Sequence, residues 1–336
     1  MQPKILNKNT SYVLLHAVGG NNTAGKISKQ LPNIDLRSVQ RALIRLTEIG
    51  LLIRNGINNP RYSVNYENLV RFAVADKFLE NENRPMTKFN HELFTWLDTL
   101  SNKKLDVLFG EYITNEASST PFEPMTPKEL EYLTVELSWK SSALEGNTYT
   151  LLDTQLLLLE GIKAKNKTAF ETRMILNHKD AVAFIIEHKE LFRSSVDFRS
   201  LEELHRIIGN NLGISTGVRK KLVRITASNY KPLANPHQLR EQATSALGVI
   251  SRAANPYVKA LLALGLIPYL QIFEDGNKRT GRMLANALLI HSVGKGFSLR
   301  KTDAKALALA YLSFYEFNSM YALSRILGNE LEPADR

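Results

Sequence analysis

The stretch Gln271-Ile-Phe-Glu-Asp-Gly-Asn-Lys-Arg-Thr-Gly-Arg282 separates two apolar segments that have the periodicity of buried helices. It is therefore predicted to be a tight loop between two core helices. Gly276 permits backbone angles that a side chain would forbid, and the helix that begins after it has free N–H groups that favour an anion. The opposing interpretation is a glycine-capped loop with two solvated arginines, so a second motif is needed to decide.

Three side chains of this stretch suit a magnesium-bound nucleotide. Arg279 and Arg282 are three residues apart, hence neighbours on one helix face, and a guanidinium binds phosphate oxygens in a fork. Asp275 offers a hard carboxylate oxygen to Mg²⁺. The loop therefore predicts ATP and Mg²⁺ as ligands.

The second motif is Ser141-Ser-Ala-Leu-Glu145-Gly146-Asn147, at the end of a helix predicted over 127–145. Thr126, Pro127 and Glu129 have the pattern of a capped helix start. Together the two motifs resemble the Fic family, whose core motif is His-Pro-Phe-x-Asp-Gly-Asn-(Gly or Lys)-Arg-x-x-Arg and whose inhibitory motif is (Ser or Thr)-x-x-x-Glu-(Gly or Asn). The resemblance runs from about residue 93 to 331.

The resemblance implies a role for each matching residue. Phe273 would anchor the loop in the core, Asp275 would hold Mg²⁺, and Arg282 would grip the γ-phosphate. The residues implied at the nucleotide are Gly276, Asn277, Lys278, Arg279 and Arg282. The inhibitory residues are Ser141, Glu145 and Gly146, and the carboxylate of Glu145 would pair with Arg282 and so block productive ATP binding. The alternative is that Glu145 only caps or solvates a helix end.

Gln271 departs from the family pattern, in which a histidine takes the proton of the protein hydroxyl that receives AMP from ATP. A neutral amide can orient a hydroxyl but cannot accept its proton, and loss of a general base costs about two to four orders of magnitude in rate. His205 and His237 fall in or near the core region, and we interpret both as structural or surface residues. Ile272 replaces a proline, a change expected to alter only how the chain enters the turn.

Lys278 stands where many AMP-transferring members have glycine. A long cation there resembles the Doc toxins, which phosphorylate their targets, so the transferred group stays open. That chemistry also depends on the missing histidine.

A flap is implied at 217–232, between the two motifs. In the family it binds an extended segment of the target protein by strand addition. The residues that the resemblance implies at the target are Lys220, Lys221, Leu222, Val223 and Arg224. These basic residues suggest an acidic target segment, although charges on a strand edge also protect it from aggregation.

The N-terminal region predicts a different kind of domain. Helices are expected over residues 11–18, 23–31 and 35–51, and the segment 52–64 has Asn55-Gly56 at its turn, a hairpin signal. Three helices followed by a hairpin predict a winged helix, whose third helix enters the major groove of DNA. The residues expected to contact DNA are Arg37, Gln40, Arg41, Arg45, Arg54 and Arg61.

The charge of this region favours nucleic acid. Residues 1–75 hold ten Lys or Arg against three acidic residues, a balance of +7 out of +10 for the whole chain. A basic patch beside a helix-turn-helix is typical of phosphate binding. We favour DNA over a winged helix that serves dimerisation or contact with a protein.

Composition sets outer limits. The length of 336 residues predicts about two domains, and the 44% apolar share is typical of globular proteins. No apolar stretch reaches the roughly twenty residues of a membrane span, and no signal peptide is expected, since Met-Gln-Pro-Lys lacks an apolar segment. The absence of cysteine excludes disulfides and thiolate chemistry. A cytoplasmic location is the simplest prediction.

The sequence thus predicts a mainly α protein: a Fic-type helical bundle with a small β-hairpin flap, plus an N-terminal winged-helix (α+β) domain. The predicted boundaries are 1–72 for the winged helix, 73–92 for a helical linker and 93–336 for the Fic domain. Three functions compete: a slow AMP transferase acting on a protein or on itself, a catalytically silent nucleotide sensor that tunes DNA binding, and a Doc-like phosphotransferase, which is the least favoured. A homodimer is left open.

Overall fold

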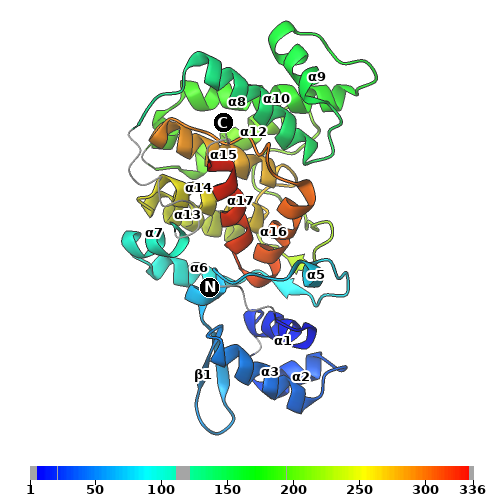
Figure 1. Cartoon of the computed structure of the whole chain (residues 1–336), viewed down its shortest axis with the longest axis vertical. Helices are drawn as coiled ribbons and strands as arrows, with labels where there is room; N and C mark the ends of the chain where they lie inside the picture. Colours follow the sequence, from blue (N-terminus) through cyan, green and yellow to red (C-terminus); the bar gives the residue numbers. More distant parts are fainter. Residues whose placement is uncertain (1–5, 21, 111–121, 194, 333–336) are drawn as a thin grey trace. The chain divides into compact units, whose positions relative to one another are not determined.

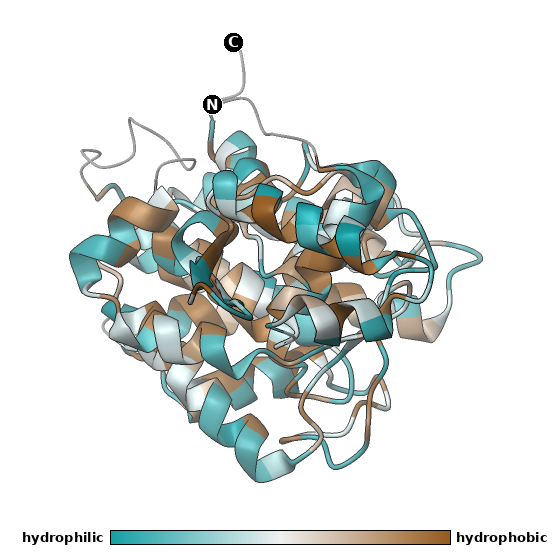
Figure 2. Ribbon diagram, turned by 90° about the horizontal axis from the view of Figure 1, so that it is seen from below, coloured by the Kyte–Doolittle hydropathy of each residue, from teal (hydrophilic) through white to brown (hydrophobic). Residues whose placement is uncertain are grey.

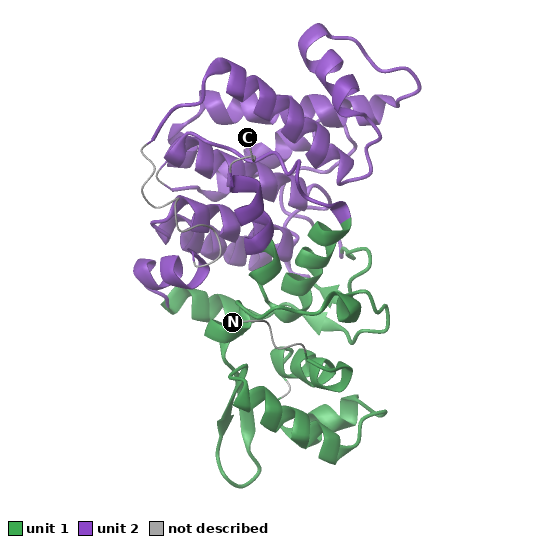
Figure 3. Ribbon diagram, in the orientation of Figure 1, with its two compact units in different colours: residues 1–99, 223–232, 305–323 green, residues 100–222, 233–304, 324–336 purple. Residues whose placement is uncertain are grey.

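The computed structural model describes residues 6–20, 22–110, 122–193 and 195–332, and the ends of the predicted domains at 1–5 and 333–336 lie outside these ranges (Figure 1). The chain divides into two compact units (Figure 3). Unit 1 comprises Met1–Thr99, Val223–Pro232 and Lys305–Leu323, and unit 2 comprises Leu100–Leu222, Leu233–Ala304 and Ser324–Arg336. The predicted domain boundaries stay a prediction, because these units are discontinuous in sequence.

Unit 1 begins with three helices, each started by a side chain that accepts a backbone N–H. These are α1 (Lys8–Val18) capped by Asn7, α2 (Ala24–Gln30) capped by Thr23, and α3 (Leu36–Glu48) capped by Asp35. Strands β1 (Leu52–Asn55) and β2 (Arg61–Val64) then pair antiparallel, with Leu52 opposite Val64 and Asn55 opposite Arg61. Three helices followed by a two-stranded antiparallel hairpin is the order of elements expected from the sequence of this region.

The rest of unit 1 is short elements and one long helix. They are α4 (Tyr66–Leu69), α5 (Asp76–Leu79), β3 (Thr87–Lys88), α6 (His91–Thr99), β4 (Tyr230–Lys231) and, from Lys305 onward, α16 (Ala304–Phe317). Arg84 forms a buried ion pair with Glu316, whose Oε2 lies 2.6 Å from the Arg84 Nε. That pair ties the segment before β3 to α16 within the unit.

The predicted flap hairpin differs from what the structure contains. Within 217–232 only β4 is a strand, and it pairs in parallel with β3, so that Thr87 lies opposite Tyr230. The physical reason is burial: Tyr230 is 2% exposed and its ring stacks on that of Tyr315 at 5.8 Å. The end of the segment is therefore drawn into a core instead of folding back on itself.

Unit 2 is helical. Its helices are α7 (Asn102–Gly110), α8 (Pro127–Ala143), α9 (Leu151–Gln155), the π-helical turn η2 (Leu156–Glu160), α10 (Ala169–Glu187), α11 (Glu190–Arg193), α12 (Phe198–Ile208), α13 (Pro236–Arg252), α14 (Pro256–Leu270), α15 (Asn277–Val293) and, from Ser324 onward, α17 (Tyr321–Leu331). The chain is thus mainly α, as predicted. Figure 2 shows both hydrophilic and hydrophobic residues along many helices of the chain, as expected for amphipathic helices.

Helix α8 begins with the predicted capping box, in which Thr126 and Glu129 exchange hydrogen bonds. Its end differs from the predicted 127–145. The helix stops at Ala143, and Glu145 belongs to the turn that follows, because Gly146 adopts a φ of +91° that ends the helical conformation.

Helices α14 and α15 form the centre of unit 2 and pack directly against each other (Figure 1). Every residue of α14 from Ala260 to Leu270 is buried. Gly281 of α15 faces Pro268, and a Cβ at this position would lie only 3.0 Å from the proline Cδ. The two helices therefore approach closely where they flank the motif stretch. Among the described residues, no helix is both long enough and apolar enough to cross a membrane.

Candidate functional site

The motif stretch forms a compact loop between α14 and α15. Gln271 adopts a left-handed conformation with φ of +50°, and Gly276 does so with φ of +82°. Asn277 bridges the loop: its Oδ1 accepts the N–H of Phe273 at 3.0 Å, and its Nδ2 donates to the Phe273 carbonyl at 2.9 Å. These bonds fix the loop before any ligand binds.

His205 of α12 supports this loop from the side. Its ring stacks on that of Phe273 at 3.7 Å, and its Nε2 donates to the Asp275 carbonyl at 2.9 Å. Burial lowers the pKa of His205 to about 4, since the hydrogen bond to Asp275 only partly offsets desolvation. His205 is thus a neutral structural partner, whereas His237 is exposed on α13. No local pattern around His205 indicates that it reaches the loop.

The side chain of Gln271 is turned back toward α14. Its Nε2 donates to the Pro268 carbonyl at 2.7 Å, and its Oε1 lies 3.4 Å from Asn277 Nδ2. The residue is 8% exposed. The amide nitrogen thus satisfies a carbonyl at the end of α14, and the amide oxygen faces Asn277 in the loop. Both polar atoms of the Gln271 side chain therefore have partners within the protein.

Arg279 lies at the start of α15 and is almost fully buried, with 3% of its side chain exposed. Its Nη2 lies 2.9 Å from Asp275 Oδ2, whereas its Nη1 is buried without a hydrogen-bond partner. No side chain caps this helix, whose N-cap is Gly276. An uncapped helix start beside an unpartnered guanidinium nitrogen is an arrangement that favours an anion.

Arg282 is paired with the second motif. Its Nη2 lies 2.8 Å from Glu145 Oε1, and only 1% of the Arg282 side chain is exposed. The other carboxylate oxygen of Glu145 lies 3.7 Å from Lys278 Nζ. Burial alone would raise the pKa of Glu145, but the charges of Arg282 and Lys278 outweigh it and lower that pKa. The carboxylate is therefore held ionised between two cations.

Ser141 completes this arrangement. Its hydroxyl oxygen accepts Arg282 Nε–H at 2.9 Å, and its carbonyl accepts Arg282 Nη2–H at 3.1 Å. Gly146, the third predicted inhibitory residue, supplies the left-handed turn described above. Ser141 and Glu145 are thus brought together with Arg282, which lies 141 and 137 residues away from them in sequence.

Asp275 is the residue available for a divalent cation. Its side chain is 66% exposed, and among the described residues no group of three or more acidic or histidine side chains forms a metal site. Mg²⁺ is commonly held by one or two carboxylates together with substrate phosphates, so a lone exposed aspartate fits an ion that arrives with a nucleotide.

The flap residues differ sharply in exposure. Lys220, Lys221, Leu222 and Arg224 are exposed, and Val223 is half-buried. Arg219, which sequence reasoning did not single out, is 2% exposed and donates to the Gln271 carbonyl at 2.6 Å and to the Lys221 carbonyl at 2.8 Å. Nothing in the sequence distinguishes this arginine from the exposed lysines that follow it.

The predicted DNA-contacting residues lie on unit 1. Arg37, Gln40, Arg41, Arg45, Arg54 and Arg61 are all exposed. The first four share α3, whose opposite face is buried through Val39, Leu43 and Leu46. The helix therefore presents a basic face to solvent.

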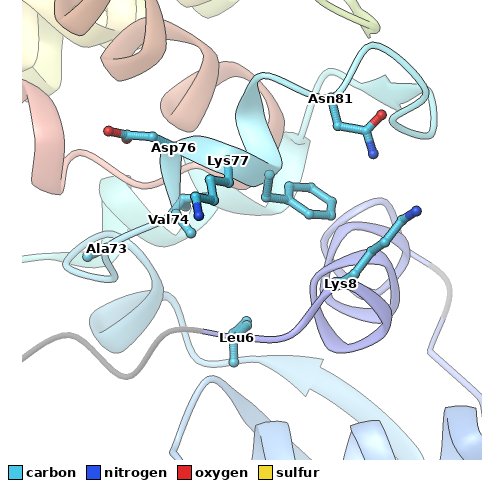
Figure 4. Close-up of a pocket in the computed structure, with 9 residues that line it drawn as sticks. Leu6, Lys8, Ala73, Val74, Asp76, Lys77 and Asn81 are labelled. Carbon is cyan, nitrogen blue, oxygen red and sulfur yellow. The ribbon is translucent and has the colours of Figure 1, made fainter.

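Unit 1 also contains a pocket of about 1000 Å³ (Figure 4). It is lined by Leu6, Lys8, Ala73, Val74, Ala75, Asp76, Lys77, Phe78 and Asn81. None of these residues belongs to either motif, so we assign the pocket no part in the site.

Comparison with known proteins gives consistent relatives. Residues 195–289 match the Fic/DOC family, a range that includes the motif loop but not Glu145 or the N-terminal helices. The chain is 25% identical over 224 residues to the protein adenylyltransferase Fic of Nematostella vectensis, covering 65% of this chain and 50% of that protein. It is 27% identical over 164 residues to the protein adenylyltransferase fic-1 of Caenorhabditis briggsae, covering 45% of this chain and 30% of that protein. The chain thus spans half or less of these relatives.

A solved structure shares the fold. A Fic domain containing signaling protein from Bacteroides thetaiotaomicron superposes with a TM-score of 0.50 at 20% identity, covering 68% of this chain and 92% of that chain.

Proposed function

This chain belongs to the Fic/DOC family, and we propose that it binds ATP at the start of α15 in a site that Glu145 holds closed. The observation that carries the proposal is the ion pair of Glu145 with the buried Arg282, at 2.8 Å. A guanidinium nitrogen that is bonded to a carboxylate is not free for phosphate. The unpartnered Nη1 of Arg279 beside it supports an anion as the natural ligand.

The proposed chemistry is transfer of AMP from ATP to a hydroxyl of a protein, the activity in the names of the adenylyltransferase relatives. The hydroxyl oxygen forms a bond to the α-phosphorus, the bond from that phosphorus to the bridging oxygen breaks, and pyrophosphate leaves. Asp275 would hold the Mg²⁺ that neutralises charge on the phosphates. The hydroxyl proton must go to a base.

Gln271 limits this reaction. An amide cannot take up the proton, and its Nε2 already donates to the Pro268 carbonyl. We therefore expect transfer about two to four orders of magnitude slower than in a chain with a histidine at this position. A catalytically silent nucleotide sensor is the alternative that this residue favours.

Calorimetric titration with ATP–Mg tests the closed site. We expect weak or no binding by the native chain and clear binding by Glu145→Ala. Glu131→Ala is the matched control, since Glu131 is an exposed glutamate of the same helix, α8, and should leave binding unchanged. Absence of binding by both native and Glu145→Ala chains would refute the nucleotide site.

Labelling with α-phosphate-labelled ATP separates catalysis from sensing. If Gln271 blocks turnover, Gln271→His combined with Glu145→Ala should label protein strongly, and the native chain should not. Clear labelling by the native chain would contradict the silent alternative. If neither the native chain nor the double variant labels protein, AMP transfer is refuted and nucleotide sensing is the function that is left.

A second candidate function, DNA binding by unit 1, is favoured by the exposed basic face of α3. Its arginines and Gln40 point to solvent from a helix that follows two others and precedes a β-hairpin. In a winged helix this is the element that enters the major groove. We propose that α3 and the arginines of β1 and β2 contact DNA phosphates and base edges.

A further inference from the structure

His178 of α10 is a fully buried histidine that neither motif contains, and it lies at the back of the candidate site. Its Nδ1 lies 2.8 Å from the Met174 carbonyl, which can only accept, so Nδ1 carries the proton. Its Nε2 therefore offers a lone pair, and the Ser141 hydroxyl lies 2.9 Å from it. The Ser142 hydroxyl, 3.3 Å from Nδ1, is a weaker second neighbour.

This arrangement dictates the direction of each bond that follows. Ser141 has one hydroxyl proton, and it donates that proton to His178. The lone pairs of the same oxygen then accept Arg282 Nε–H at 2.9 Å. A directed chain of hydrogen bonds thus runs from the Met174 carbonyl through His178 and Ser141 to Arg282.

This series of hydrogen bonds holds Arg282 at its Nε and leaves the Glu145 carboxylate as the partner that can be replaced. Arg282 Nε is bound by the Ser141 hydroxyl, while Nη2 donates both to the Ser141 carbonyl at 3.1 Å and to Glu145 at 2.8 Å. The carboxylate is 20% exposed, whereas His178 and Ser141 are completely buried. Of the two sides of Arg282, only the Glu145 side can be exchanged without opening the core.

We propose that His178 is a positioning residue that orients Arg282 through Ser141, and that it keeps this orientation when a γ-phosphate replaces Glu145. The inference rests on the proposed function for its nucleotide part. Burial lowers the pKa of His178 to about 3, so the ring keeps its lone pair at neutral pH. A protonated ring would have no acceptor for the Ser141 hydroxyl.

The first test measures nucleotide affinity in the full chain carrying Glu145→Ala. His178→Phe keeps an aromatic ring but removes the lone pair, so the Ser141 hydroxyl is no longer oriented toward Arg282 Nε. We expect ATP binding to weaken about ten-fold, because the bond that is then weakened is a hydrogen bond to a charged group. AMP lacks the γ-phosphate, so its affinity should change less than two-fold. His178→Gln retains an acceptor and should restore ATP affinity, and Asp180→Ala, at an exposed site of α10, should leave it unchanged.

Two results would overturn the inference while leaving the nucleotide site intact. One is an unchanged ATP affinity in His178→Phe; the other is an equal loss for ATP and AMP, which a general loosening of the core would produce. Ser141→Ala should weaken ATP binding as much as His178→Phe does. The double variant should bind ATP no more weakly than either single variant, because both substitutions break the same series of hydrogen bonds. Additive losses would also contradict the proposal.

A second measurement needs no nucleotide, and so separates this inference from the proposed function. The Arg282 Nε–H of the native chain should give a slowly exchanging NMR signal, assigned by its loss in Arg282→Lys. In His178→Phe that signal should exchange at least ten-fold faster, and in His178→Gln it should stay slow. If exchange in His178→Phe matches the native rate, His178 does not hold Arg282.

Discussion

Two sets of arginines, both assigned to phosphates from the sequence, differ completely in their surroundings. Arg279 and Arg282 are 3% and 1% exposed at the start of α15, and a carboxylate already pairs with each. Arg37, Arg41 and Arg45 project from α3 into solvent. The difference teaches that the same side chain can act as a fixed element of a preformed site or as a mobile charge on a surface.

The comparison has energetic consequences. A buried guanidinium is already desolvated and oriented, so its affinity for phosphate depends on the protein groups that contact it. An exposed one must be ordered on binding and is screened by salt. The first set should respond to substitutions in the core around it, and the second to ionic strength.

The largest contrast is expected in stability. Arg282→Ala should lower the free energy of unfolding by about 3–5 kcal/mol, because it leaves Glu145 and the Ser141 hydroxyl without their main partner. Arg41→Ala should change it by less than about 0.5 kcal/mol, as is usual for an exposed residue. Urea denaturation of both variants measures the difference. Similar values for the two variants would show that the buried and the exposed arginines contribute alike to stability.

A pH dependence should follow from the histidines around the first set. Burial holds the pKa of His178 at about 3 and that of His205 at about 4, both below the ordinary 6.5. Between these values the unfolded chain binds protons that the folded chain does not, so stability is lost as pH falls. Each histidine contributes up to about 1.4 kcal/mol per pH unit. In urea denaturation between pH 4.5 and 6.5, His178→Gln should reduce the slope by about one proton; an unchanged slope would show that His178 titrates normally.

The second set should be revealed by salt. If α3 binds DNA, Arg41→Ala with Arg45→Ala should reduce the slope of log affinity against log salt by about two, since each arginine neutralises about one phosphate. Fluorescence anisotropy with a labelled duplex measures this. Lys163→Ala with Lys165→Ala removes the same charge from an exposed loop of unit 2 and serves as the control. Equal effects of both pairs would point to net charge alone.

The smallest effect on nucleotide binding is expected at Lys278, a partly exposed residue beside the buried arginines Arg279 and Arg282. Lys278 is 37% exposed and lies 3.7 Å from Glu145, so its pairing is worth at most about 1 kcal/mol. Lys278→Ala should therefore raise ATP affinity of the native chain only about two- to five-fold. Calorimetry should show no such rise in the Glu145→Ala background. A rise in that background as well would mean that Lys278 hinders nucleotide binding independently of Glu145.

Local patterns predicted the helical framework well. The motif stretch does lie between two buried helices, and the capping box of Thr126 and Glu129 is present. Period and capping are properties of neighbouring residues, so they can be recognised in one sequence. The predicted hairpin at 52–64 was confirmed for the same reason.

The family resemblance implied one contact between distant segments, that of Glu145 with Arg282, but others escaped prediction. The parallel pairing of Tyr230 with Thr87 joins residues that no local rule connects. His178 and Arg219 gave no signal, because an isolated histidine or arginine is identical in sequence whether buried or solvated. Glu145 was expected at a helix end, and the structure places it in the turn that follows α8.

The position of Glu145 has a kinetic consequence. It lies in a turn held by hydrogen bonds from Glu145 N–H to the Ser142 carbonyl and from Gly146 N–H to the Ala143 carbonyl. Beyond that turn, Asn147 is fastened to α10 through the Glu171 carbonyl at 2.8 Å. Releasing Arg282 therefore requires rearrangement of one short turn while α8 stays in place. Turn and loop motions take nanoseconds to microseconds, whereas typical enzymes turn over in milliseconds or longer. Closure of the site would thus behave as a rapid equilibrium, and added ATP would meet no lag.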